Sequence, residues 1–143
     1  MSIWHSKFSI EGINEKGKNT MAEQIGIEFV EFGPDYLKAR MPVDHRSIQP
    51  AGILHGGASV ALAETIGSVG AYLTVDPEKS ECVGLEINAN HVRSAKNGYV
   101  YGTGKPIHLG KSTQIWEIRI TNDKDLLLCI SRITMAVLNK TGL

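Results

Sequence analysis

The chain has 143 residues, of which 42% are hydrophobic, enough for one domain with a full core and too few for several. Fifteen Lys and Arg side chains balance fifteen Asp and Glu, so the net charge is zero with neutral His. Zero net charge argues against a general nucleic-acid binder, which needs a basic surface, and does little to oppose self-association. We therefore predict one domain over residues 1–143 that binds no nucleic acid.

The first half of the chain predicts two short helices, a strand, a loop and one long helix. The short helices are expected over residues 9–15 and 19–25, with Asn19-Thr20 as a capping signal for the second. Apolar and polar residues alternate over 37–43 with the period of a half-buried strand. After a loop, the small and apolar residues of 55–75 favour a helix, which Asp76-Pro77 should end.

Four further strand segments follow this helix, near residues 83–88, 99–101, 116–121 and 126–138. Asn97-Gly98 is a hairpin signal before the second of them. Strands joined by short turns should be antiparallel. One long apolar helix and about six antiparallel strands predict an α+β domain whose sheet curls around the helix and buries it.

The cysteines and the N-terminus indicate the compartment. Cys82 and Cys129 lie far apart in apolar runs and form no C-x-x-C pair, which favours free buried thiols over a disulfide. Residues 1–7 have no apolar signal core, and the polar and glycine content of 58–75 is wrong for a membrane span. We predict a cytoplasmic protein that does not associate with membranes.

Glu64 is the most informative residue, because it is the only charged side chain within 55–75. A carboxylate inside an apolar helix costs free energy unless it is paired, hydrogen-bonded or used. His55-Gly56-Gly57 opens the run, so free backbone N–H groups are expected at the helix start. A buried acid beside a free helix N-terminus suits acyl transfer. For Glu64 alone, a structural carboxylate bonded to nearby backbone is the simpler alternative.

Five longer motifs stand out: Gln49-Pro50-x-Gly52-x-Leu54-His55-Gly56-Gly57, Ala63-Glu64-Thr65-x-Gly67-Ser68, Asn88-Ala89-Asn90-His91-x-Arg93, Ile107-x-Leu109-Gly110-Lys111 and Trp116-x-Ile118. In these motifs the chain resembles the hotdog-fold acyl-CoA thioesterases, most closely the branch of 4-hydroxybenzoyl-CoA and 1,4-dihydroxy-2-naphthoyl-CoA thioesterases. This resemblance implies a hotdog fold in which two subunits pair their sheets into one continuous sheet. It also implies active sites at that homodimer interface, and often a homotetramer.

The resemblance implies a role for each residue of the motif. Glu64 matches the catalytic acid, and Gly56 matches the glycine whose N–H polarises the thioester carbonyl. Gln49 and His55 match side chains that orient this carbonyl, and Ser68 matches a hydroxyl one turn after the acid. At residue 51 an alanine stands where an aromatic residue is expected, which concerns the shape of the acyl pocket rather than the chemistry.

These residue types suit thioester hydrolysis on chemical grounds. Glu64 can attack the carbonyl or activate a water, and the helix start can stabilise the oxyanion. Ser68 follows four residues later on the same helix face, where it can hold the carboxylate or a water, although helix packing is an alternative role.

The spacing of Gly56 and Glu64 predicts a dimer. Eight residues of helix span roughly 12 Å, so one carbonyl cannot readily reach both groups of the same chain. Two antiparallel copies of the helix would bring Gly56 near Glu64 of the partner subunit.

A basic tract is the candidate grip for the CoA phosphates. No acidic residue occurs between Glu86 and Glu117. Cations there could bind the diphosphate and 3′-phosphate of CoA, although lysines that merely solubilise strand ends are an equal alternative. The candidate residues are His91, Arg93, Lys105, His108, Gly110 and Lys111.

The sequence as a whole predicts an acyl-CoA thioesterase acting on an aromatic acyl group. It needs no resident cofactor, because CoA is part of the substrate, and its five histidines lack metal-ligand spacing. Two alternatives stay open: a hydratase or dehydratase on the same fold, and a non-catalytic acyl-CoA-binding module.

Overall fold

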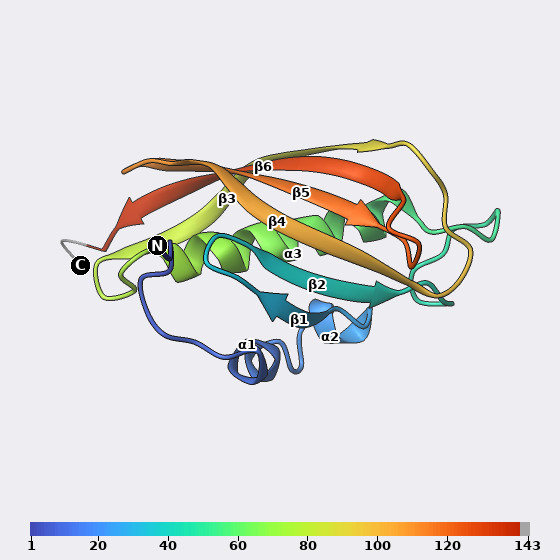
Figure 1. Cartoon of the computed structure of the whole chain (residues 1–143), viewed down its shortest axis with the longest axis horizontal. Coiled ribbons are helices and arrows are strands. Elements are labelled where there is room, and N and C mark those ends of the chain that lie inside the picture. The colour runs from blue at the N-terminus through green and yellow to red at the C-terminus, as the bar shows by residue number, and fades with distance from the viewer. Residues whose placement is uncertain (141–143) are drawn as a thin grey trace.

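The computed structural model describes residues 1–140, which form one antiparallel sheet of six strands around a long helix (Figure 1). The elements are α1 (Ile10–Lys16), α2 (Met21–Gln24), β1 (Glu28–Phe32), β2 (Leu37–Pro42), α3 (Gly56–Thr74), β3 (Ser80–His91), β4 (Tyr99–Leu109), β5 (Thr113–Thr121) and β6 (Leu127–Asn139). The predicted α+β hotdog architecture is confirmed, with every predicted element present.

The strand order is β1-β2-β4-β5-β6-β3, so β3 and β4 are consecutive in the chain but separated in the sheet. The hairpin expected at Asn97-Gly98 is therefore wrong. Gly98 does adopt the left-handed backbone of a turn, with φ of 73°, but this turn delivers the chain to β4 on the far side of two other strands. Within residues 1–140, β3 pairs only with β6 and leaves its other edge unpaired.

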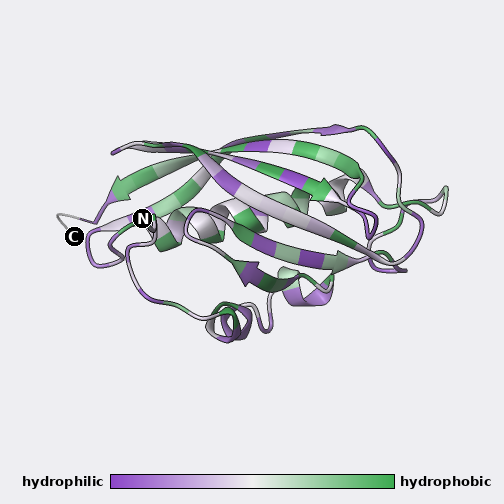
Figure 2. Cartoon of the chain, in the orientation of Figure 1, coloured by the Kyte–Doolittle hydropathy of each residue, from purple (hydrophilic) through white to green (hydrophobic). Residues whose placement is uncertain are grey.

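The core lies between α3 and the concave face of the sheet, where the strands alternate as predicted. Figure 2 shows this alternation along β2, whose buried positions are Leu37, Ala39 and Met41. Two glycines let the helix and sheet approach closely. A β-carbon on Gly67 would lie 2.5 Å from Ile133, and one on Gly102 would lie 2.5 Å from Ile66. Neither site has room for a side chain.

The N-terminal segment packs across β1 and the C-terminal half of α3 (Figure 1). Ser9 caps α1 by accepting the Gly12 N–H at 3.0 Å. The Asn14 amide binds both backbone groups of Phe29, at 2.9 and 2.8 Å, and so fixes α1 to β1. Trp4 stacks on the buried Trp116 with 6.2 Å between ring centroids.

Both cysteines are free thiols, as predicted. Cys129 is buried and Cys82 is partly buried. Burial raises the pKa of both thiols, because desolvation disfavours the thiolate.

Candidate active site

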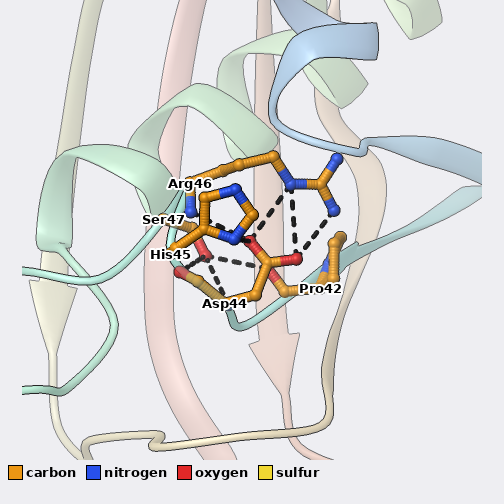
Figure 3. Close-up of polar contacts among 5 residues, drawn as sticks. All are labelled: Pro42, Asp44, His45, Arg46 and Ser47. Atoms are coloured by element: carbon orange, nitrogen blue, oxygen red, sulfur yellow. Dashed lines mark hydrogen bonds and ion pairs between the residues drawn. The ribbon is translucent and has the colours of Figure 1, made fainter.

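The loop before α3 is held by a compact polar cluster (Figure 3). Arg46 donates to the Asp44 carboxylate through its side chain, at 2.7 Å, and through its backbone N–H. These bonds lower the pKa of Asp44 to about 2, so the carboxylate stays charged into the acidic range. The buried Ser47 hydroxyl donates to the Pro42 carbonyl at 2.8 Å, and the Ser47 carbonyl accepts the His55 N–H at 2.8 Å. The cluster therefore ties the start of α3 to the end of β2.

Three hydrogen-bond donors gather where this loop enters α3. The His55 Nδ1 accepts the Gly57 N–H at 2.7 Å, so a neutral His55 ring carries its proton on Nε2. The Gln49 Oε1 accepts the Ala51 N–H at 2.6 Å, which leaves the Gln49 amide N–H groups to donate elsewhere. Among residues 1–140, the Gly56 N–H has no acceptor. A free N–H at a helix N-terminus, with further donors on the adjoining loop, is suited to a polarised carbonyl oxygen.

Glu64 is exposed in the single chain, so the expectation of a buried acid is wrong at this level of assembly. The sheet covers only one side of α3, where Leu62, Ala63 and Ile66 are buried, and Glu64 lies on the opposite, open side. The alternative of a structural carboxylate bonded to nearby backbone is not observed either, since no hydrogen bond or ion pair holds the Glu64 carboxylate within residues 1–140. Its Oε1 lies near β3, 3.2 Å from where a β-carbon of Gly84 would stand. A charged group without a partner remains available for chemistry.

A cavity of about 370 Å³ opens beside Glu64, between α2 and α3. Glu64 and Ser68 both line it, which confirms that the two side chains share one helix face. Most of the remaining lining is apolar, from Met21, Ile25 and Val69 among others.

His91 lies against the helix start, a position that the sequence did not reveal. A β-carbon on Gly56 would stand 3.0 Å from the His91 Nε2, so glycine at 56 is needed partly to admit this ring. His91 ends β3, and the β3–β6 register pairs it with Cys129. Because this contact depends on sheet register, local sequence carries no signal for it.

The basic candidates divide into three places in one chain. His91 and Arg93 lie at the end of the sheet where α3 begins, and Arg93 Nη1 donates to the Leu127 carbonyl at 2.8 Å. Lys105 is on the outer face of β4, 3.7 Å from the Asp35 carboxylate.

The remaining candidates for binding the CoA phosphates lie at the opposite end of the sheet. His108, Gly110 and Lys111 lie at the β4–β5 turn, near the end of α3 (Figure 1). The 19 residues of α3 span about 28 Å, and the Gln114 amide at the start of β5 donates to the Thr74 hydroxyl at the end of this helix, so the turn lies far from the helix start. One chain alone therefore does not gather the predicted CoA grip.

Two further observations concern membranes and metals. No helix within residues 1–140 is long and apolar enough to cross a membrane. Over the same residues, no group of three or more His, Cys, Asp or Glu side chains is placed to hold a metal ion.

The curled six-stranded sheet and the long helix that it covers define a hotdog fold. Residues 51–129 match the Thioesterase superfamily, and the chain belongs to this family. It is a thioester hydrolase.

The similarity to known relatives extends over nearly the whole chain. It is 52% identical to the 1,4-dihydroxy-2-naphthoyl-CoA hydrolase of Escherichia coli, over 95% of this chain and 99% of that protein. It is 45% identical to the proofreading thioesterase EntH of Cronobacter turicensis, over 95% of this chain and 98% of that protein. The crystal structure of a Haemophilus influenzae thioesterase superimposes with a TM-score of 0.95 at 44% identity, covering 98% of this chain and 97% of that one.

Proposed function

We propose that this thioesterase hydrolyses aromatic acyl-CoA thioesters to a carboxylate and free CoA, in sites shared between two subunits. The observation that supports this proposal is that one helix carries both a Glu64 carboxylate and a Gly56 N–H without hydrogen-bond partners. Membership of the thioesterase family favours hydrolysis over the hydratase and non-catalytic binding alternatives. The aromatic acyl group is supported by the similarity to the naphthoyl-CoA hydrolase.

The chemistry follows from the donors and the acid. The thioester carbonyl oxygen accepts the Gly56 N–H, with the His55 Nε2–H and the Gln49 amide beside it, and these donors stabilise the oxyanion. Glu64 either bonds to the carbonyl carbon, giving an anhydride that water then hydrolyses, or removes a proton from an attacking water. In both routes the C–S bond breaks and the thiolate of CoA leaves. Ser68 can hold the Glu64 carboxylate or the water in place.

A second subunit would complete the site. The unpaired edge of β3 exposes Val83 and Leu85, with exposed fractions of 42% and 61%, beside the open side of α3. Pairing two β3 edges antiparallel would join the sheets and set the helices side by side. The same symmetry would bring Lys111 of the partner subunit toward the end of the sheet where His91 and Arg93 lie. The candidate residues for binding the CoA phosphates would then come together from two subunits.

The test is an assay of thiol release from benzoyl-CoA, a hydroxynaphthoyl-CoA and acetyl-CoA. We expect the aromatic substrates to give kcat/KM at least about tenfold above acetyl-CoA, because the ring fills the apolar cavity beside Glu64. Equal rates for acetyl and aromatic thioesters would contradict the aromatic assignment while leaving hydrolysis intact.

The CoA grip predicts a separate kinetic effect. Lys111→Ala and Arg93→Ala should raise KM more than they lower kcat, because phosphate contacts stabilise the ground and transition states alike. The effect should shrink with an acyl-pantetheine, which lacks the nucleotide. Lys38→Ala, a cation over the Tyr101 ring, is the matched control. Equal losses on both substrates would assign Lys111 and Arg93 to folding or chemistry instead.

A further inference from the structure

Residues 47–55 form an arch between β2 and α3 that carries Gln49 near its tip. At the base of the arch the His55 N–H donates to the Ser47 carbonyl at 2.8 Å, and nearer the tip the Gln49 N–H donates across the arch at 2.9 Å. His55 is also the N-cap of α3, so the helix fixes its position. Gln49 is held within the arch itself, since its side-chain oxygen accepts the Ala51 N–H. The direction of the Gln49 amide therefore depends on how the base of the arch is held.

Two kinds of contact hold this base (Figure 3). The buried Ser47 closes the turn that follows β2, with its N–H donating to the Asp44 carbonyl at 2.9 Å and its hydroxyl donating to the Pro42 carbonyl at 2.8 Å. The Arg46 side chain adds a two-pronged contact, with its Nη2 and Nε donating to the Asp44 carboxylate at 2.7 and 3.1 Å. The Arg46 backbone N–H also donates to this carboxylate, at 2.9 Å, and that bond does not need the side chain. The guanidinium is therefore dispensable for the turn itself.

The same guanidinium also meets the turn between α2 and β1. In Figure 3 it extends toward the blue ribbon of α2 and the turn after it. A β-carbon on Gly26 would stand 3.1 Å from the Arg46 Nη2 and 2.7 Å from the Pro42 Cγ, so the backbone of this turn lies directly against both side chains. The turn is tied to α2 by the Ile27 N–H, which donates to the Ala22 carbonyl at 2.8 Å. Arg46 therefore lies between the arch and α2.

α2 in turn forms one wall of the cavity beside Glu64. The residues that this wall contributes are Met21, Ala22 and Ile25. α2 has only four residues, and within the described part of the chain its N-cap Thr20 makes no side-chain capping hydrogen bond. So short a helix has little stability of its own, and its position depends on the elements packed around it. A continuous series of contacts thus joins the cavity wall to the arch, and the Arg46 guanidinium is its central link.

We propose that Arg46 is a positioning residue, which links the α2 wall of the cavity to the arch and so holds the Gln49 amide at the thioester carbonyl when an acyl group fills the cavity. This inference rests on the proposed function, because it takes hydrolysis at Glu64 and donation by Gln49 as given. Within residues 1–140 Arg46 does not line that cavity, so it acts through its neighbours. An acyl group that presses on α2 gains from the link, whereas an acetyl group leaves most of the cavity empty and gains nothing.

The first test is Arg46→Ala, which removes the guanidinium but keeps the backbone bond to Asp44 and the bonds of Ser47. We expect kcat for benzoyl-CoA to fall about tenfold with KM within about twofold, because a misplaced donor weakens the transition state more than it weakens binding. For acetyl-CoA, kcat should stay within about twofold of the wild-type value. Steady-state thiol release measures both constants for both substrates.

Arg40→Ala is the matched control for stability. The Arg40 Nη2 lies 2.9 Å from the Glu28 carboxylate, and its side chain is 35% exposed, against 37% for Arg46. That ion pair joins β1 to β2 on the outer face of the sheet, away from the arch. Loss of either ion pair should change the thermal midpoint by similarly small amounts, whereas only Arg46→Ala should lower the turnover of benzoyl-CoA. Equal kinetic losses in the two variants would overturn the proposal.

A double-mutant cycle with Gln49→Ala tests whether Arg46 acts through the arch. In a Gln49→Ala background, Arg46→Ala should lower kcat for benzoyl-CoA by less than about threefold, because the donor that Arg46 positions is already gone. An undiminished loss in that background would show that Arg46 does not position Gln49. Wild-type kcat in Gln49→Ala alone would instead refute the donor role of Gln49 in the proposed function.

The outcomes separate the positioning role from the proposed function. If folded Arg46→Ala lowers kcat for benzoyl-CoA and acetyl-CoA alike, or for neither, the guanidinium does not link the cavity to the arch. In either case the wild-type protein still hydrolyses benzoyl-CoA and the proposed function stands. If the wild-type protein hydrolyses no acyl-CoA of either kind, the proposed function itself fails.

Discussion

Glu64→Gln should lower kcat for benzoyl-CoA at least about 100-fold, since a general base or nucleophile accelerates the reaction by that factor or more. Gln keeps the size and hydrogen-bonding capacity of the side chain but can neither attack a carbonyl nor take a proton from water. Glu64 is exposed and unpaired in the single chain, so the change should not unfold the protein. KM should change far less than kcat, because the substitution removes an interaction made in the transition state.

The matched control is Glu78→Gln, at an exposed carboxylate beyond the end of α3, which should keep wild-type turnover. Circular dichroism and the thermal midpoint establish that both variants fold. Turnover near the wild-type rate in folded Glu64→Gln would remove Glu64 from the mechanism, whatever its place in the motif.

Most of the fold could be predicted from sequence because its signals are local. The alternation over 37–43 places Leu37, Ala39 and Met41 on one face, and β2 buries these three. The small and apolar run after His55 predicts α3, which ends at Thr74 just before Asp76-Pro77. Strand order was not predictable in the same way, because the pairing of β3 with β6 joins residues about 40 to 60 apart in the chain and no local pattern encodes it.

The roles of the candidate site residues stay predictions, whereas the surroundings of Glu64 differ from those expected. Gln49, His55 and Gly56 lie together because they are neighbours on one loop and helix start. The exposure of Glu64 could not be read from α3 itself, since the helix is apolar around its whole circumference while one sheet covers only one side of it. An apolar face left open is physically unfavourable in water, and it is the reason to expect a second subunit there.

Subunit mixing should restore activity to two inactive proteins if the site is shared. Glu64→Gln subunits lack the acid, and His55→Ala/Gln49→Ala subunits lack two donors at the helix start. In a mixed dimer, one site combines both lesions and the other combines neither, because Gly56 works with Glu64 of the partner subunit. Equal mixing gives mixed dimers as half the population, so about a quarter of wild-type activity should return.

The physical basis is that Gly56 and Glu64 lie on one straight helix and cannot approach each other. Their separation of roughly 12 Å exceeds what a single carbonyl spans, so only a second helix can supply the missing partner. Exchange must be verified, for example by co-purification of an untagged subunit with a tagged one, and each parent must be shown to be folded and inactive alone. If exchange is complete and no activity returns, both groups act from the same chain. The acid would then have to reach the carbonyl by a route other than antiparallel pairing of α3.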